Sequence, residues 1–368
     1  MYLERINKIS FSLQMPPKKA RIKDIALRAG VSIGTVDRVL HERGEVAEET
    51  KRKILQITRE LDYSPDFMAR ALKTRRTIRL LSLLPEPTEE NAFWAKHPDG
   101  IKKAMDELDP FPVTLDQYTF DIRSEKDFQK KAAEVLNYHP DGVILAPIFK
   151  AESIMFCEKL AGENIPFVFI DGFLRETNFL CYTGEDIFQS GRVAGQLVDM
   201  ITPVDKDILV INMARNLQNI HHLNNRTQGF LSYFPQKGKN TGKKISLNIP
   251  DLEPEKMRQE IKKDFFSNNN IGSIFVTGSK SYKIAGFLES EGIDSINLIG
   301  YDLLDKNVMY LKSGIIKFLI GQRPEEQIYK GIKKLFDFLT LNRVPEKFEY
   351  LPIDVVTSEN VDFFIKQN

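Results

Sequence analysis

The sequence predicts an α/β protein in which a small N-terminal helical unit precedes two doubly wound subdomains. Residues 21–62 contain no proline and carry apolar residues at helical spacing. From about residue 78 the pattern changes, and apolar β runs alternate with amphipathic helical stretches. This alternation is typical of parallel sheets covered by helices on both faces. Seven strands are predicted, more than one such sheet usually holds, which indicates two subdomains.

Charge is unevenly distributed along the 368 residues. Residues 1–76 hold 17 Lys and Arg against 10 Asp and Glu, whereas the remainder holds 35 against 41. A basic N-terminal piece on an acidic body indicates that the small piece alone meets a polyanion. With 42% hydrophobic residues and no apolar run near the ~18 residues of a membrane helix, we expect a globular, cytoplasmic protein with no membrane partner.

Three short helices are predicted in the N-terminal unit. The first covers residues 22–29 with one apolar stripe and ends at Gly30, which suits a tight turn. The second begins after Ser32, whose side-chain oxygen is expected to accept a backbone N–H near Thr35. The third covers residues 47–61. Together they form a helix-turn-helix arrangement, which holds the second helix rigidly and leaves its outer face open for a DNA groove.

Breaks in this pattern set the predicted domain boundaries. Ser-Pro-Asp ends the helical headpiece, residues 21–65, and a short basic segment, residues 66–77, follows as a linker. A helix of that length is marginal alone in water, so we expect the linker to order only when packed against a partner. Residues 1–20 are expected to be a disordered leader, of which the first 14 could also be an upstream-start artefact.

The body, residues 78–368, carries the predicted strands and their covering helices. Strands are predicted at 78–84, 113–120, 142–147, 166–171, 207–212, 273–278 and 296–302. Helices are predicted at 99–108, 125–138, 151–163, 186–201, 224–234, 255–268, 281–291 and 326–341. Ligands of doubly wound folds bind outside the carboxyl ends of strands, so residues that follow the strands are candidate ligand contacts.

One long motif in the headpiece is more specific than these patterns. The run from Asp24 to Leu40 fits D-[VI]-A-x-x-A-G-V-S-x-x-T-V-x-R-V-L without a gap, and Leu61, Tyr63 and Pro65 fit a Leu-x-Tyr-x-Pro segment after it. With these motifs, residues 23–74 closely resemble the DNA-binding headpiece of the LacI/GalR transcription factors. The body resembles that family in the order of six runs: DGVILAP, PFVFID, EDIFQSGRVAGQL, NRTQGF, NLIGYD and GQRPEEQIYKG. The resemblance implies two subdomains like those of type I periplasmic binding proteins.

The resemblance also implies DNA contacts from the second helix. Ser32 and Thr35 would hold phosphates, and Arg38 could reach guanine O6 and N7 in the major groove. The family's variable specificity positions fall on Ile33 and Gly34, so base reading there would be apolar contact or close backbone approach.

The linker implies a further DNA contact, and two positions depart from the family pattern. Leu72 matches a leucine that the family wedges into the minor groove, where unstacking is offset by wrapped contact. Asp37 stands where serine is frequent, and it could accept from a cytosine amino group or pair with Arg38. Asp66 replaces an asparagine of the linker.

Effector contacts are implied in the cleft between the subdomains. Asp171 and Asp302 each end a β run, and the planar guanidinium of Arg226 can hold two hydroxyls or a carboxylate. Phe93 and Trp94 are expected to form an apolar platform for a sugar face. The remaining matches to cleft positions are Tyr182, Ser279 and Gln322. Gly278 and Ser279 stand where the family usually has an asparagine, so recognition of a polyol differs at that corner.

Enzymatic chemistry is not predicted. The five histidines show no metal-binding spacing, and Cys157 and Cys181 fit neither a disulfide scaffold nor a zinc site. There is no P-loop or nucleophile elbow, and we expect no catalytic residue, metal or cofactor. Asp171 and Asp302 could form a carboxylate pair for glycoside chemistry, but hydrogen bonding to hydroxyls fits this fold better.

The sequence therefore predicts a transcription regulator that a sugar, polyol or derivative controls by favouring one arrangement of the subdomains. One headpiece offers few base contacts, so we expect a homodimer on a palindromic operator. The alternative, a solute-binding protein feeding a transporter, fits residues 78–368 alone and leaves the headpiece without a role.

Overall fold

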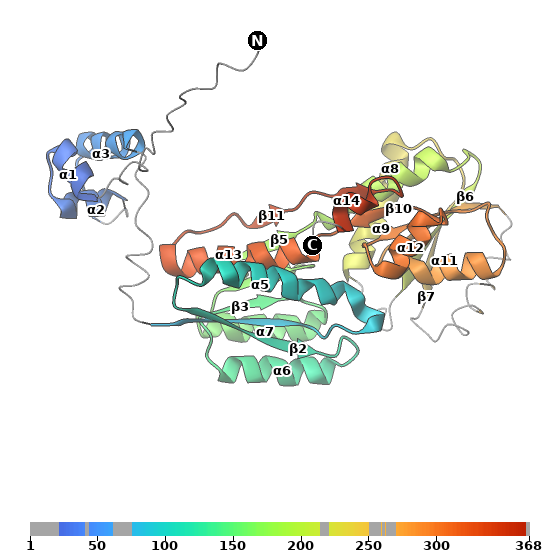
Figure 1. The fold of residues 1–368 in the computed structure, drawn as a ribbon, viewed down its shortest axis with the longest axis horizontal. Helices are drawn as coiled ribbons and strands as arrows, with labels where there is room; N and C mark the ends of the chain where they lie inside the picture. The colour runs from blue at the N-terminus through green and yellow to red at the C-terminus, as the bar shows by residue number, and fades with distance from the viewer. Residues whose placement is uncertain are drawn as a thin grey trace, which may run out of the picture. The chain divides into compact units, whose positions relative to one another are not determined.

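The structure of the protein is a computed structural model, and it describes residues 22–40, 44–61, 76–213, 221–249, 259, 262 and 270–365 (Figure 1). These residues fall into two compact units, one before Arg76 and one from Arg76 onward. The predicted leader, the predicted helix at 255–268 apart from two residues, and Leu72 of the linker lie outside the described residues.

The N-terminal unit is the three-helix arrangement that the sequence predicts. It consists of α1 (Ile22–Ala29), α2 (Ile33–Leu40) and α3 (Glu48–Glu60). Gly30 joins the first two helices with a φ of 72°, a left-handed conformation that glycine adopts without steric cost. The helices meet in one apolar core made of Ile25, Ala26, Ala29, Val36, Val39, Ile54 and Ile57. Each large aliphatic residue buried there contributes about 1.5–3 kcal/mol.

The first subdomain of the body is a six-stranded sheet, parallel throughout, with the order β11-β5-β4-β3-β1-β2. Its strands are β1 (Ile78–Pro85), β2 (Val113–Phe120), β3 (Gly142–Leu145), β4 (Phe167–Ile170), β5 (Cys181–Gly184) and β11 (Phe348–Tyr350). Its helices are η1 (Glu89–Lys96), α5 (His97–Leu108), α6 (Glu125–Asn137), α7 (Lys150–Gly162) and α13 (Pro324–Leu341). Neighbouring residues of β1 face opposite layers, because Leu80 packs with α5 and α13 while Leu81 packs with α6 and α7.

The second subdomain is another six-stranded sheet, with the order β12-β10-β9-β8-β6-β7. Its strands are β6 (Asp207–Met213), β7 (Lys244–Ile249), β8 (Ile271–Val276), β9 (Asn297–Tyr301), β10 (Ile316–Gly321) and β12 (Asp354–Val356). All pairs are parallel except β10 with β12. Its helices in the described part of the chain are α8 (Ile187–Ile201), α9 (His221–Lys237), α11 (Ser281–Ser290), α12 (Asp305–Lys312) and α14 (Val361–Ile365). Val210 faces α8 and α9, whereas Leu209 faces α11 and α12.

The chain passes between the two sheets three times, at residues 185–186, 322–323 and 351–353. The first crossing joins β5 to α8, which packs on the second sheet, and the next joins β10 to α13, which packs on the first. The last crossing lies between β11 and β12. These crossings bring residues 185 and 322 to the place where both sheets end, which positions the site described below.

The predicted fold class is confirmed. All seven predicted strands are present, as β1, β2, β3, β4, β6, β8 and β9. Five further strands were not predicted from the sequence, namely β5, β7, β10, β11 and β12. Within the described part of the chain, no helix combines the length and apolarity that crossing a lipid bilayer requires.

Candidate functional site

The exposed start of α2 carries the side chains expected to meet DNA. The Oγ atom of Ser32 accepts the backbone N–H of Thr35 at 3.1 Å, which confirms the predicted helix cap. Arg38 folds back along its own helix, and its Nε donates to the Gly34 carbonyl oxygen at 3.3 Å. Its Nη2 lies 3.5 Å from Oγ1 of Thr35. Ile33 is 52% exposed, so an apolar side chain and a guanidinium share one open helix face.

Nothing in the described part of the headpiece requires glycine at position 34. A Cβ atom added there would lie 3.7 Å from Oγ of Ser32, which is ordinary van der Waals contact. The φ of Gly34 is not in the left-handed region that favours glycine. The missing side chain therefore leaves space on the outer surface of α2, where a partner would lie.

In the body, Asp171 and Asp302 occupy corresponding places in the two subdomains. Asp171 follows β4 of the first sheet and Asp302 follows β9 of the second. Their φ angles are 63° and 69°, a left-handed conformation that is uncommon outside glycine but that aspartate tolerates. Strained backbone of this kind concentrates at functional sites, and both aspartates stand at the carboxyl ends of parallel strands.

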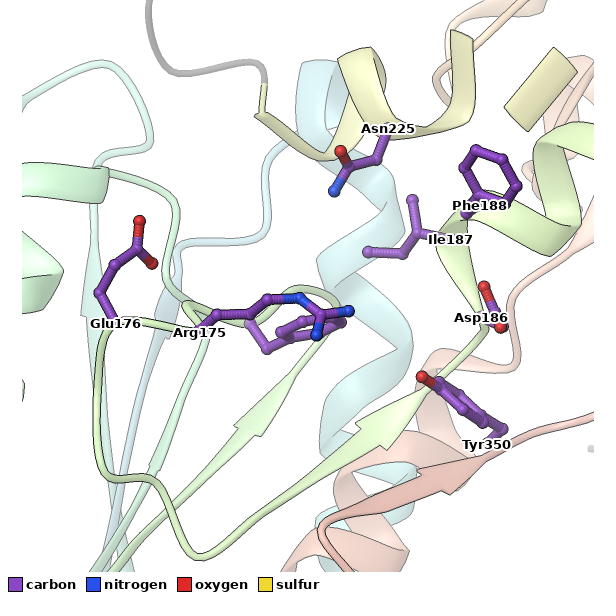
Figure 2. Close-up of a pocket in the computed structure, with 8 residues that line it drawn as sticks. Arg175, Glu176, Asp186, Ile187, Phe188, Asn225 and Tyr350 are labelled. Carbon is purple, nitrogen blue, oxygen red and sulfur yellow. The ribbon is translucent and has the colours of Figure 1, made fainter. Parts of the chain in front are cut away.

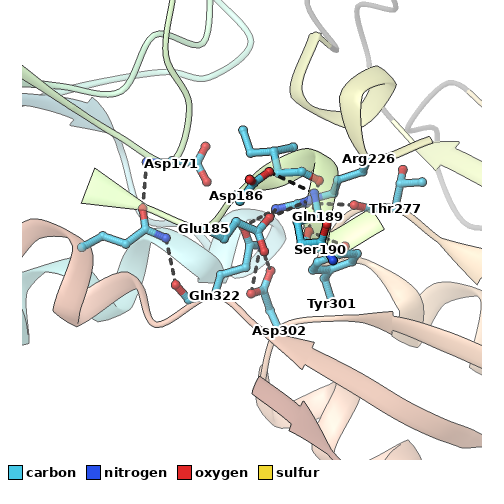
Figure 3. A network of polar contacts seen from close by, with 12 residues as sticks. Asp171, Glu185, Asp186, Gln189, Ser190, Arg226, Thr277, Tyr301, Asp302 and Gln322 are labelled. Carbon is cyan, nitrogen blue, oxygen red and sulfur yellow. Dashed lines mark hydrogen bonds and ion pairs between the residues drawn. The ribbon is translucent and has the colours of Figure 1, made fainter. Parts of the chain in front are cut away.

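Arg226 of α9 is the centre of a buried polar network that includes Asp302 (Figure 3). The residue is only 2% exposed. Its Nε donates to Oε1 of Glu185 at 2.9 Å, and its Nη1 donates to the Thr277 carbonyl oxygen at 2.9 Å. Its Nη2 donates to Glu185 and to Oε1 of Gln322. The guanidinium, which was predicted from the sequence to hold a ligand, is thus engaged by the protein itself.

Two glutamines connect the aspartates of the two subdomains. Nε2 of Gln322 donates to both carboxylate oxygens of Asp302, at 3.0 and 2.9 Å. Nε2 of Gln327 donates to the Gln322 carbonyl oxygen at 2.9 Å, and its Oε1 accepts the backbone N–H of Asp171 at 2.7 Å. A continuous chain of hydrogen bonds therefore runs from the end of β9 to the end of β4.

The carboxyl groups of this network are electrostatically strained. Burial raises the pKa of Asp302 to about 8 and the pKa of Asp171 to about 6, although Arg226 acts in the opposite direction. Burial also raises the pKa of Glu185, whose side chain is 1% exposed. Perturbed carboxyl groups gathered at the ends of strands are typical of a binding site.

Buried Asn307 of α12 supports the backbone on either side of Asp302. Its Nδ2 lies 2.9 Å from the Ser279 carbonyl oxygen, 2.9 Å from that of Tyr301 and 3.0 Å from that of Asp302. Its Oδ1 accepts from Oγ of Ser281 at 2.9 Å. This side chain ties the end of β9 to the turn after β8, which is the corner where the sequence places Ser279.

The structure places the other predicted effector residues beside the network or apart from it. Tyr182 is fully buried, and its hydroxyl donates to the Glu185 carbonyl oxygen at 2.9 Å. Phe93 and Trp94 belong to η1 and are buried in the core of the first subdomain. The Trp94 ring stacks on His97 with centroids 4.6 Å apart. Their role as an apolar platform for a ligand stays a prediction.

A pocket of about 580 Å³ lies next to the network (Figure 2). Its walls come from both subdomains and from the first crossing, and they consist of Phe173, Arg175, Glu176, Asp186, Ile187, Phe188, Asn225 and Tyr350. None of the predicted effector residues is in this wall, although Asp186 and Asn225 directly adjoin Glu185 and Arg226 in the sequence.

Three members of the site were not predicted from the sequence: Glu185, Gln327 and Asn307. Glu185 and Gln327 lie inside two of the runs that resemble the family, but Glu185 precedes Asp186 and Gln327 follows Glu326, so nothing local distinguished them from polar surface residues. Asn307 lies in a helix that was not predicted. Among the described residues, no group of three or more His, Cys, Asp and Glu side chains could hold a metal ion.

The comparisons with known proteins cover both units. Residues 21–66 match the family described as bacterial regulatory proteins, lacI family, and residues 83–342 match the family described as periplasmic binding protein domain. The second match spans more than half of the chain.

Two curated relatives are regulators. The chain is 39% identical over 123 residues to the HTH-type transcriptional regulator RegA of Clostridium saccharobutylicum, a match that spans 33% of this chain and 35% of RegA. It is 26% identical over 286 residues to the ribose operon repressor of Lactococcus lactis subsp. lactis, spanning 76% of this chain and 80% of that protein.

A solved structure agrees with the fold. The crystal structure of a protein assigned as a LacI transcriptional regulator from Bacteroides fragilis superposes with a TM-score of 0.71 at 27% identity. The superposition covers 78% of this chain and 99% of that chain.

Proposed function

We propose that this chain, which belongs to the LacI family of bacterial regulatory proteins, is a DNA-binding transcription regulator controlled by a small sugar-like effector. The observation that carries the proposal is the joining, in one chain, of an open helix-turn-helix face to a body whose two sheets end at one polar network. The ribose operon repressor among the relatives supports a sugar-like effector. The solute-binding alternative accounts for the body alone, and the named relatives do not include an enzyme.

In this proposal, α2 lies in the major groove of the operator. Ser32 and Thr35 hold phosphates, Arg38 reads a guanine edge, and Ile33 and Gly34 allow apolar contact or close backbone approach. Two copies of the chain bind a palindromic operator in the cytoplasm, because the second headpiece supplies the base contacts that one headpiece lacks. Leu72 of the linker would add the minor-groove wedge.

The effector acts by favouring one orientation of the subdomains. Asp171 and Asp302 belong to different sheets, so a ligand that binds both is sensitive to how the sheets are placed. Gln322 lies on a crossing and already bonds Asp302, so ligand binding there alters a segment that joins the subdomains. The remaining predicted contacts, Phe93, Trp94, Tyr182 and Ser279, would complete the site, whereas Arg226 would hold Glu185 and Gln322 in place.

Replacing Arg38 by alanine tests the DNA half of the proposal. An operator is first selected from a random duplex library with the full chain, and binding is then measured by fluorescence anisotropy. Loss of a base contact should cost about 1–3 kcal/mol, or roughly 5- to 150-fold, and relax the preference at one base pair. Equal weakening on all sequences with a shallower salt dependence would instead make Arg38 a phosphate contact. Failure of the full chain to select any duplex would overturn the proposed function.

A further inference from the structure

The network around Arg226 holds more acidic groups than basic groups. Asp171, Glu185 and Asp302 provide three carboxyl groups, and Arg226 is the cation that acts on each of them. Among the described residues, the largest remaining electrostatic influences on these three groups come from acidic side chains. Glu185 and Asp302 are only 1% and 4% exposed, so water compensates this charge poorly.

The guanidinium of Arg226 is not available to a ligand anion. Its Nε and both of its Nη atoms already donate to the protein, and its face covers the ring of Tyr301 with the guanidinium carbon 4.0 Å from the ring centroid. An anionic ligand would have to displace Glu185 or Gln322 before it met the positive charge. It would then lie among three carboxyl groups.

The network does, by contrast, contain carboxylate oxygens that are available to accept further hydrogen bonds. Oε2 of Glu185 is buried and makes no hydrogen bond of standard geometry among the described residues, although the Ser190 hydroxyl is near enough to lower the pKa of Glu185. The half-buried carboxylate of Asp171 likewise makes none in the described part of the chain, because only its backbone N–H is bonded. A buried acceptor without a donor is unfavourable, so a ligand that supplies donors here improves the site.

We propose, on the basis of the regulator function above, that the effector is an amino sugar or a closely related polyol carrying an ammonium group. Near pH 7 Asp302 is largely protonated, because burial raises its pKa to about 8, and Glu185 is paired with Arg226, so Asp171 carries the excess negative charge. Hydroxyl groups alone would satisfy the free acceptors but leave this charge uncompensated. An ammonium group satisfies both, because it donates three hydrogen bonds and carries a full positive charge. Sugar phosphates and sugar acids are rejected, since they add negative charge to a buried acidic site.

The test uses matched sets of three sugars on the full chain. Glucosamine, glucose and glucose 6-phosphate form one set, and galactosamine, galactose and galactose 6-phosphate form another. Binding is measured by calorimetry and by the shift in Tm. We expect at least one amine to bind tenfold or more tightly than its neutral counterpart, and the phosphates to give no shift. The proposal is overturned if a phosphate binds as tightly as the amine of its set, or if no amine binds.

Asp171→Asn provides the decisive variant because its side chain makes no hydrogen bond in the network. It removes one charge and should lower the preference for amine over neutral sugar by about tenfold, or roughly 1.4 kcal/mol. Asp294→Asn is the matched control, since Asp294 is exposed and precedes β9 at the opposite end of the strand. A preference that is unchanged in Asp171→Asn, or equally reduced in the control, contradicts the proposal.

Operator binding measured in parallel separates this inference from the function on which it rests. If the chain binds its selected operator and a phosphate or neutral sugar releases it, the proposed regulator function is supported and the proposed ligand class is wrong. If the chain selects no operator, the proposed regulator function itself is wrong.

Discussion

Replacing Arg226 by alanine tests whether its buried ion pair with Glu185 holds the body together. The substitution leaves the Glu185 carboxylate 1% exposed and without the cation that acts on it. It also removes the donor to the Thr277 carbonyl oxygen. Removing one partner of a buried pair costs about 3–5 kcal/mol, because the other charge stays buried without compensation. We therefore expect the unfolding free energy of the body to fall by about that amount.

A double variant separates the loss of the pair from the loss of packing. Arg226→Met combined with Glu185→Leu removes both charges and keeps much of the apolar volume. Replacing a whole buried pair in this way is often close to neutral. The double variant should therefore be more stable than Arg226→Ala by about 2 kcal/mol or more, although it carries one substitution more.

The fluorescence of Trp94 provides the assay. It is the only tryptophan of the chain, and it is 3% exposed in the core of the first subdomain, so it reports on the body and not on the headpiece. Urea unfolding followed by this signal gives the midpoint and the slope for each variant. A midpoint for Arg226→Ala that corresponds to less than 1 kcal/mol of destabilisation would refute the reasoning. So would a double variant that is no more stable than Arg226→Ala.

Three further predictions concern stability and DNA preference. Gly34→Ala should raise the stability of the headpiece to thermal unfolding by up to about 1 kcal/mol, since the added Cβ fits. It should also change operator preference in anisotropy measurements, and a less stable headpiece would contradict the prediction. Gly229→Ala should lower the unfolding free energy of the body by about 1–3 kcal/mol in urea, because the added Cβ would overlap the Phe188 carbonyl oxygen and push α8 from α9. A decrease below about 0.5 kcal/mol would show that the helices adapt. Burial lowers the pKa of His97 to about 3, so the buried neutral imidazole contributes its full share of the unfolding free energy only above the unfolded pKa of 6.5. This contribution is lost as the pH falls, by up to about 1.4 kcal/mol per pH unit. Wild type and His97→Gln compared by urea unfolding at pH 7, 6 and 5 should therefore differ most at pH 7, and a constant difference would disprove this origin.

The headpiece and the central strands were predictable because local pattern and burial agree in them. α1, α2 and α3 present one apolar face each, and the glycine turn and serine cap are marked by single residues. The long central strands are apolar on both faces, as sheets covered by helices require. The missed β11 and β12 have three residues each. Strands so short form because a neighbouring strand pairs with them, and the sequence does not carry that information.

The places of the two aspartates at the strand ends were predictable from the sequence, but the hydrogen-bond partners of Arg226 were not. Asp171 and Asp302 were found because each directly follows an apolar run, and parallel strands bring such residues to one edge. The partners of Arg226 could not be found this way. Glu185 lies 41 residues before it and Gln322 lies 96 residues after it, and both are brought to it by the crossings between the sheets. A local sequence pattern cannot distinguish an arginine whose guanidinium is free to bind a ligand from one that already donates its hydrogen bonds within the protein.

This difference affects how an effector could act. A ligand hydroxyl that replaces Gln322 on Asp302 exchanges one hydrogen bond for another, which changes the free energy by only about 0.5–1.5 kcal/mol. Converting a population from 1:99 to 99:1 requires about 5.5 kcal/mol of differential binding. A ligand that contacts Asp302 alone is therefore too weak a switch. The Asp171 carboxylate lies in the other subdomain and makes no hydrogen bond among the described residues, so a ligand that binds both aspartates gains a contact there without losing one. The control of DNA binding proposed for this protein thus requires a ligand that binds both subdomains.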